Sequence, residues 1–101
     1  EIEKALAGID GIVDLAVIGV PDEAWGEVPM LVLHATRDTD AVLGEIEARA
    51  ARDLAGYKRP KVAVVCDEPL ARTFSGKIAK PLLRKQFPAV PPEAKRLFTA
   101  R

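Results

Sequence analysis

The chain has 101 residues, nearly half of them hydrophobic, and its fifteen basic residues are balanced by fifteen acidic ones. This length predicts one compact domain, and the zero net charge predicts no general affinity for nucleic acid or a membrane surface. No apolar run approaches the ~20 residues that a membrane span needs, and no secretory signal is recognisable. One cysteine, Cys66, excludes an internal disulfide. We therefore expect a cytoplasmic protein without a membrane span.

The charges are unevenly distributed. Residues 1–53 hold twelve acidic and four basic residues, whereas residues 54–101 hold three acidic and eleven basic ones. The window 69–92 has no acidic residue, and its basic residues are Arg72, Lys77, Lys80, Arg84 and Lys85. Such a segment indicates either a local anionic partner, such as a phosphate or carboxylate, or a solvated helix face.

In chain order, residues 1–7 have apolar positions at helical spacing and predict a short helix that Gly8 ends. Because this helix starts at the first residue and no Met precedes it, we expect the chain to be part of a longer polypeptide. Residues 12–20 predict a strand buried on both faces. A second strand follows from residue 28 or 30 to 35, and Pro29 restricts its first residues to a sheet edge.

The next helix is predicted from about residue 41 to 55, with Asp40 as its N-terminal cap and Gly56 as its stop. A third strand over residues 61–66 and a loop over residues 67–76 follow. The predicted order α-β-β-α-β-α is typical of an α+β domain, with a small three-stranded sheet flanked by helices.

The last helix is constrained by Pro81, which cannot lie in a helix interior, so we expect the helix to begin near residue 78 or 79. Ile78, Leu82 and Leu83 are expected to face inward. The proline-containing residues 88–101 are expected to form an extended tail after a domain that spans residues 1–87.

Residues 73–78 read Thr-Phe-Ser-Gly-Lys-Ile and carry the most specific chemistry. A phosphate-binding P-loop is excluded, because Ala71 and Ile78 occupy positions where that motif needs glycine and a hydroxyl residue. What remains is Lys77, presented by Ser75 and Gly76 just before a helix. Gly76 permits a positive φ, and the amides and dipole at a helix start favour anions. These residues alone leave open whether Lys77 is functional or a solvated surface lysine.

Four blocks in the same order resemble the C-terminal domain of the adenylate-forming superfamily, which includes acyl-CoA synthetases, peptide-synthetase adenylation domains and luciferases. The blocks are a helix opened by residues 1–3, Ala-Val-Ile-Gly-Val-Pro-Asp at 16–22 with Trp-Gly-Glu at 25–27, Leu-Ala-Gly-Tyr-Lys-Arg-Pro at 54–60, and Arg-Thr-Phe-Ser-Gly-Lys-Ile at 72–78. The Tyr-Lys-x-Pro sequence at 57–60 is most similar to acyl-CoA synthetases.

The resemblance implies an AMP-forming acid–thiol ligase, of which this chain is the mobile C-terminal domain and inactive alone. A fatty or aromatic acid and ATP, with Mg²⁺ held by the N-terminal domain, would form an acyl-adenylate, and coenzyme A would displace AMP. Lys77 matches the family's catalytic lysine, and Ser75 and Gly76 match the loop that presents it. Trp25 and Arg59 lie near positions where some relatives contact coenzyme A.

One departure concerns Ala71, which stands where the family usually has proline, while Pro69 is displaced by two residues. This departure puts acetylation of Lys77 in doubt more than catalysis, because the residues from Ser75 to Lys77 match. No metal site is predicted, since His34 stands alone in a strand and is expected to be structural.

Two alternatives stay open. The chain could belong to an adenylating enzyme that loads another acceptor. It could also be a non-enzymatic basic module that binds nucleic acid through Lys58, Arg59, Lys61 and the last helix. Such a surface usually includes several stacking aromatics, and only Tyr57 and Phe74 are available for that role.

Overall fold

The computed structural model describes residues 2–22 and 26–97. Its elements in chain order are α1 (Ile2–Ala5), β1 (Ile12–Asp22), β2 (Gly26–Ala35), α2 (Thr39–Asp53), the 3₁₀ helix η1 (Gly56–Lys58), β3 (Val62–Cys66), α3 (Lys80–Gln86) and β4 (Lys95–Arg96). The predicted α+β class and the order of the first six helices and strands are confirmed. The sheet has four strands where three were expected.

The sheet has the strand order β1-β2-β3-β4. The β1–β2 pair is an antiparallel hairpin, β2 and β3 are parallel and joined through α2, and β4 is antiparallel to β3. Pro29 pairs with Gly19 of β1, whereas the pairing with β3 begins at Met30. Pro29 therefore lies where β2 has a neighbour on one side, as predicted.

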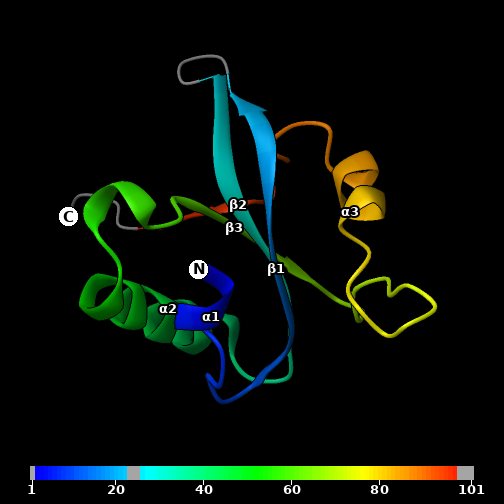
Figure 1. Ribbon diagram of the computed structural model, residues 1–101. Helices are drawn as coiled ribbons and strands as arrows, with labels where there is room; N and C mark the ends of the chain where they lie inside the picture. The colour runs from blue at the N-terminus through cyan, green and yellow to red at the C-terminus, as the bar shows by residue number, and fades with distance from the viewer. Residues whose placement is uncertain (1, 23–25, 98–101) are drawn as a thin grey trace.

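Helices cover both faces of the sheet, with α1 and α2 on one face and α3 on the other (Figure 1). Leu31 and Leu33 of β2 pack with the buried face of α2, while the alternate residues Met30 and Val32 pack with Leu83 of α3. This alternation is the period-two pattern of a strand with two apolar faces. No helix in residues 2–22 and 26–97 has the length and apolar character required to cross a membrane.

The ends of α2 differ from the prediction. The N-terminal cap is Asp38, whose carboxylate accepts a hydrogen bond of 3.0 Å from the amide of Asp40, so the assignment of Asp40 as cap is wrong. The helix also ends at Asp53, before Gly56. At this end the guanidinium of Arg59 donates to the carbonyl groups of Ala51 and Leu54, each at 3.0 Å, and so satisfies carbonyl groups that the helix leaves without a partner.

The last helix, α3, begins at Lys80 with Pro81 in its first turn, which is where proline is tolerated. Leu83 is buried, but Leu82 is 52% exposed, so the expectation that Leu82 faces inward is wrong. Leu83 and Phe87, one helical turn apart, contact the sheet, and the adjacent position 82 is rotated toward solvent.

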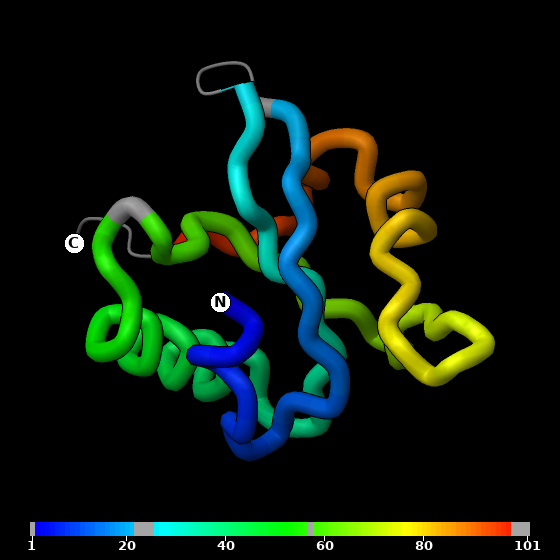
Figure 2. The backbone as a smooth tube through the Cα atoms, viewed as in Figure 1, coloured from blue at the N-terminus to red at the C-terminus, as the bar shows by residue number. Residues whose placement is uncertain are grey.

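The segment after α3 returns to the sheet, and Figure 2 shows it running back beside β3. Lys95 and Arg96 pair with Ala63 and Val62, and the amide of Leu97 donates to the carbonyl of Lys61 at 2.8 Å. Leu97 is 4% exposed and belongs to the core between the sheet, α1 and α2. Part of the segment expected to be a tail therefore forms a fourth strand and contributes to the core.

Candidate functional site

Residues 70–79 form a short hairpin that carries Lys77, which we call the Lys77 hairpin. Its two arms meet in a bridge between Arg72 and Ile78, and the amide of Ala79 donates to the carbonyl of Ala71 at 2.8 Å. At the tip, the amide of Gly76 donates to the carbonyl of Thr73 at 2.9 Å, and the amide of Thr73 donates to the carbonyl of Lys77 at 2.6 Å. These backbone hydrogen bonds give a tight turn directly before Lys77.

Gly76 occupies the position in this turn that requires its conformational freedom. Its φ is +90°, which a side chain disfavours even though a Cβ there would meet nothing within 4 Å. Ser75 lies at the tip, with its hydroxyl 3.1 Å from the hydroxyl of Thr73. Ser75, Gly76 and Lys77, which the sequence analysis grouped together, therefore lie in one tight turn.

The side chain of Lys77 lies on the surface, as do all residues from 71 to 77. No ion pair joins its ammonium to another of the described residues. The helix α3 begins at Lys80, and a dipole effect fades within the first turn. The positive charge at this site therefore comes from the lysine side chain and owes little to the helix start that the sequence suggested.

The Lys77 hairpin is tied to the sheet by Asp14, a residue that sequence analysis missed. Asp14 is 3% exposed. One carboxylate oxygen accepts from the amide of Leu70 at 3.0 Å, and the other pairs with the guanidinium of Arg72. The same guanidinium donates to the carbonyl of Gly76 at 2.7 Å. A polar connection therefore runs from β1 to the residue before Lys77.

The backbone of β1 explains where Asp14 points. The pairing with β2 shifts between Ile12 and Asp14, so Val13 is an extra residue in a β-bulge and is 52% exposed. From Asp14 onward the alternation is regular and places Asp14 in line with the buried residues Ala16 and Ile18, on the face toward α3. The available signal was a lone carboxylate in an apolar run, because a buried charge requires a partner.

Of the two predicted coenzyme A contacts, Arg59 is one that the structure describes, and it belongs to a different part of the fold from the Lys77 hairpin. Arg59 lies between η1 and β3 in the chain, whereas the Lys77 hairpin leads into α3, which covers the face of the sheet opposite to α2 (Figure 1). The guanidinium of Arg59 binds the end of α2, as described above. Trp25 lies outside the described residues.

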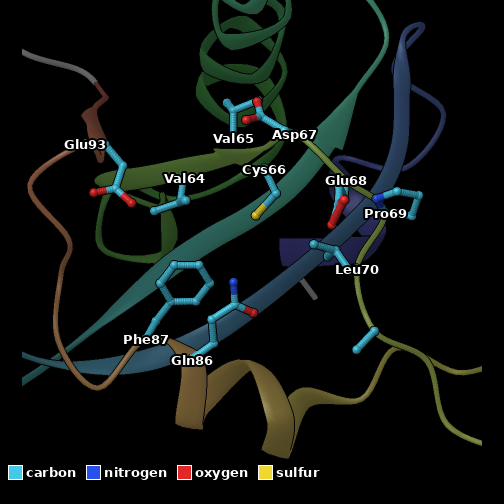
Figure 3. A pocket seen from close by; sticks show the side chains of 11 residues that line it. Val64, Val65, Cys66, Asp67, Glu68, Pro69, Leu70, Gln86, Phe87 and Glu93 are labelled. Atoms are coloured by element: carbon cyan, nitrogen blue, oxygen red, sulfur yellow. The ribbon is translucent and has the colours of Figure 1, made fainter.

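A cavity of about 650 Å³ lies between the end of β3, residues 67–71 and the end of α3 (Figure 3). Its rim carries the carboxylates of Asp67, Glu68 and Glu93. Burial, and then the charges of Asp67 and Glu93, raise the pKa of the Cys66 thiol. The cavity is therefore suited neither to an anionic ligand nor to an activated thiolate, and none of the predicted site residues that the structure describes lines it.

The remaining titratable residue singled out from the sequence is His34. Its Nδ1 lies 2.9 Å from the carbonyl oxygen of Cys66, across the β2–β3 pair, which is a structural role. Within the described residues, no group of three or more His, Cys, Asp or Glu side chains is placed to hold a metal ion.

Comparison with known proteins identifies the family. The sequence model of the family described as AMP-binding enzyme C-terminal domain matches residues 1–77. This match covers most of the chain and ends at Lys77. The chain therefore belongs to the family of AMP-binding enzyme C-terminal domains.

Curated relatives agree with this assignment. The chain is 39% identical over 93 residues to a long-chain-fatty-acid–CoA ligase of Mycobacterium tuberculosis. This match covers 92% of the chain and 18% of that ligase. It is 44% identical over 80 residues to a 2-succinylbenzoate–CoA ligase of Enterococcus faecalis, which covers 79% of the chain and 16% of that ligase. The chain thus spans less than a fifth of the length of these relatives.

Solved structures show the same fold. A fatty acyl CoA synthetase of Mycobacterium tuberculosis matches with a TM-score of 0.75 and 37% identity, over 87% of this chain and 17% of that one. ATP-bound MatB from Rhodopseudomonas palustris matches with a TM-score of 0.68 and 32% identity, and the match covers 86% of this chain and 17% of that one.

Proposed function

We propose that this chain is the mobile C-terminal domain of an AMP-forming acyl-CoA synthetase and that Lys77 is its catalytic lysine. The domain would comprise residues 1–87 together with the segment that returns to the sheet at β4, which the sequence analysis had assigned to a tail. The carboxylate of the acid attacks the α-phosphorus of ATP, which forms an acyl-adenylate and releases pyrophosphate. The thiol of coenzyme A then attacks the acyl carbon and releases AMP. Relatives named as CoA ligases, and one relative solved with ATP bound, support this reaction.

The first step brings a carboxylate against a polyanion. Two unit charges 4 Å apart repel by roughly 4 kcal/mol at an effective dielectric constant of about 20. An ammonium placed between the two reactants offsets this repulsion and stabilises the charge that develops at the phosphorus. Lys77 suits this role because its charge stands exposed at the end of an anchored turn, with no carboxylate of the described residues paired to it. This is the observation that carries the proposal.

The rest of the reaction needs the large N-terminal domain. We propose that this domain binds the acid and ATP and that Mg²⁺ enters with ATP and is held there. Arg59 and Trp25 are our candidates for contacts with the nucleotide end of coenzyme A. Because Arg59 binds the end of α2 and the Lys77 hairpin leads into α3, on the opposite face of the sheet, a rotation between the two steps would exchange one for the other in the cleft (Figure 1). ATP and coenzyme A as substrates support a cytoplasmic location.

The test uses the full-length protein and separates the two half-reactions. ATP–pyrophosphate exchange is measured across fatty, aromatic and amino acids, and the acid with the highest rate is used for the variants. Lys77→Ala should lower exchange by roughly 100- to 1,000-fold, in line with the loss of one transition-state contact. The same variant should form thioester from supplied acyl-adenylate and coenzyme A at a rate within about twofold of the parent. Normal exchange by Lys77→Ala would refute the role of Lys77.

A non-enzymatic nucleic-acid module predicts a different result. In that case, no acid would support exchange, and the protein would bind RNA or DNA with an affinity that falls steeply with salt. Transfer of the acyl group from the adenylate to a carrier thiol in place of coenzyme A, with release of AMP, would instead identify an enzyme with another acceptor.

A further inference from the structure

The position of Lys77 depends on few contacts. The Lys77 hairpin is fixed at its two ends by Leu70 and Ala79, which are 6% and 4% exposed. All residues between positions 71 and 77 are exposed, including Phe74 at the tip. Apolar packing therefore comes no closer to the lysine than Ile78, which is partly buried against the core on the α3 side of the sheet. The exposed tip, with so few buried contacts, is expected to open locally unless polar contacts restrain it.

The polar contacts come from one buried carboxylate. The Asp14 side chain is 2% exposed and projects from β1, which is held along its length by pairing with β2. Its two oxygens bind the amide of Leu70 and the guanidinium of Arg72, both in the first arm of the Lys77 hairpin. No buried side-chain nitrogen or oxygen of the described residues lacks a hydrogen-bond partner, so this arrangement is fully satisfied.

Arg72 carries the connection across the turn. Its Nη2 pairs with Asp14, while its Nη1 donates to the carbonyl of Gly76, the residue directly before Lys77. A planar guanidinium holds two partners in a fixed relative geometry, which a lysine ammonium does not. The contacts therefore run without a break from β1 through Asp14 and Arg72 to the peptide that bears Lys77.

We propose, on the basis of the catalytic role proposed above for Lys77, that Asp14 and Arg72 are positioning residues that fix the direction in which Lys77 leaves the domain. Neither side chain touches the substrates in this role. Their pair is electrically neutral, so the charge presented to the substrates is that of Lys77. Catalytic groups must be held within a fraction of an ångström, and a 1 Å displacement can lower a rate by roughly 100-fold.

The experiment compares four variants of the full-length enzyme. Asp14→Asn keeps the shape of the side chain and removes its charge. Arg72→Met removes both contacts of the guanidinium. Arg72→Lys keeps a positive charge near Asp14, but its ammonium cannot contact Asp14 and the carbonyl of Gly76 at the same time with the geometry of a guanidinium. The matched control is Asp53→Asn, which removes the carboxylate of an exposed pair with Arg52 at the end of α2.

Two measurements are made on each variant. Asp14→Asn and Arg72→Met should lower the kcat of ATP–pyrophosphate exchange by roughly 100-fold, with thioester formation from supplied acyl-adenylate unchanged. Arg72→Lys should be intermediate, and Asp53→Asn should match the parent. In Asp14→Asn, Arg72→Met and Arg72→Lys, amide hydrogen exchange should be faster in residues 70–79 and unchanged in β1 and β2.

Several outcomes would overturn the proposal. Parental pyrophosphate exchange in Asp14→Asn would do so, as would equal losses in both half-reactions, because a merely structural role weakens the whole domain. If Asp14→Asn does not fold, the two Arg72 variants decide, since the Arg72 side chain is 47% exposed and its replacement leaves the core intact.

The outcome for Lys77 is separate from the outcome for Asp14 and Arg72. Lys77→Ala leaves the carboxylate and the guanidinium in place, so hydrogen exchange in residues 70–79 should stay parental while adenylation is lost. Normal adenylation by Lys77→Ala would refute the catalytic role of Lys77 and with it the catalytic consequence of the positioning, while hydrogen exchange would still test whether Asp14 and Arg72 hold the hairpin. Unchanged hydrogen exchange in Asp14→Asn and Arg72→Met would sink the positioning role alone.

Discussion

The carboxylate of Glu3 in α1 lies 2.7 Å from the ammonium of Lys80, the first residue of α3. The same carboxylate accepts a hydrogen bond of 2.8 Å from the amide of Val17, which belongs to the edge strand β1. The pair therefore joins the two helical layers around the edge of the sheet and satisfies an amide that no neighbouring strand pairs. Lys80 also stands at the base of the Lys77 hairpin, so this contact helps to fix where the hairpin ends.

Glu3 should give the protein part of its stability against acid. Burial acts to raise the pKa of Glu3, but hydrogen bonds from Lys80 and the Val17 amide, with the charge of Lys80, outweigh it and hold the pKa below 4.5. A lowered carboxylate pKa contributes stability that is complete above the ordinary pKa and is lost as the pH falls through the folded-state value.

Glu3→Gln should therefore destabilise the protein at neutral pH, and its difference from the parent should shrink as the pH falls below 4.5. Because both side chains are more than a third exposed, the pair with Lys80 should contribute less than about 1 kcal/mol. Urea unfolding between about pH 3 and pH 7 measures the effect, and a double-mutant cycle with Lys80→Met isolates the pair. A difference that is constant across this range would contradict the assignment.

Two adjacent leucines in α3 should respond very differently to truncation. Leu83 is 1% exposed against the sheet, so Leu83→Ala leaves a cavity and should lower the free energy of unfolding by about 3 kcal/mol. Leu82→Ala, one position away, removes a side chain that is 52% exposed and should cost less than about 0.5 kcal/mol. Denaturant unfolding of both variants gives the comparison, and similar losses would mean that α3 is rotated from the orientation described.

Two glycine-to-alanine substitutions should change the free energy of unfolding in opposite directions. Gly44 lies within α2 with open space around it, so Gly44→Ala should raise the free energy of unfolding by about 1 kcal/mol. Gly76→Ala also meets open space, but the φ of +90° strains any L side chain by about 1–3 kcal/mol. In the full-length enzyme, Gly76→Ala should lower pyrophosphate exchange more than thioester formation. Parental rates in both half-reactions would show that the turn tolerates a side chain.

Cys66 should react slowly with alkylating reagents. Burial and the carboxylates of Asp67 and Glu93 raise the pKa of its thiol, so the thiolate fraction at neutral pH is lower than that of a free cysteine. Iodoacetamide should label the folded protein more slowly than the protein unfolded in guanidinium. Asp67→Asn and Glu93→Gln should each accelerate labelling, while Glu68→Gln, which lines the same cavity, serves as the control. Faster labelling of the folded protein would contradict the raised pKa.

The parts of the site that lie close together in sequence could be predicted from it. The exposed turn with Lys77, Ser75 and Gly76 is a local motif, and the residue type at position 76 permits the positive φ that the turn adopts. Asp14 could not be assigned this way, because its partner Arg72 is 58 residues away and only the fold brings the two together. The presence of a charge in an apolar strand predicts a partner and does not say which one.

The fold shows the same division between local and long-range information. The periodicity of apolar residues predicted both long strands and α2 to within a few residues. The helix ends were less predictable, because Asp38 and Asp40 are both good caps and Arg59 binds the carbonyl groups at the other end. The strand β4 has two residues, too few for an alternating pattern, and it exists because Leu97 has an apolar space to fill between the sheet and the helices.

The packing of Leu97 also affects how the domain is completed during translation. Residues 1–77, which carry the whole family match, are synthesised before Lys95–Leu97. At a rate of about 5–20 residues per second, the ribosome adds the intervening segment over a time on the order of a second. Until Leu97 packs, the apolar surface beside β3 is incomplete, so the core of the domain is closed only after the segment that follows α3 has returned to the sheet.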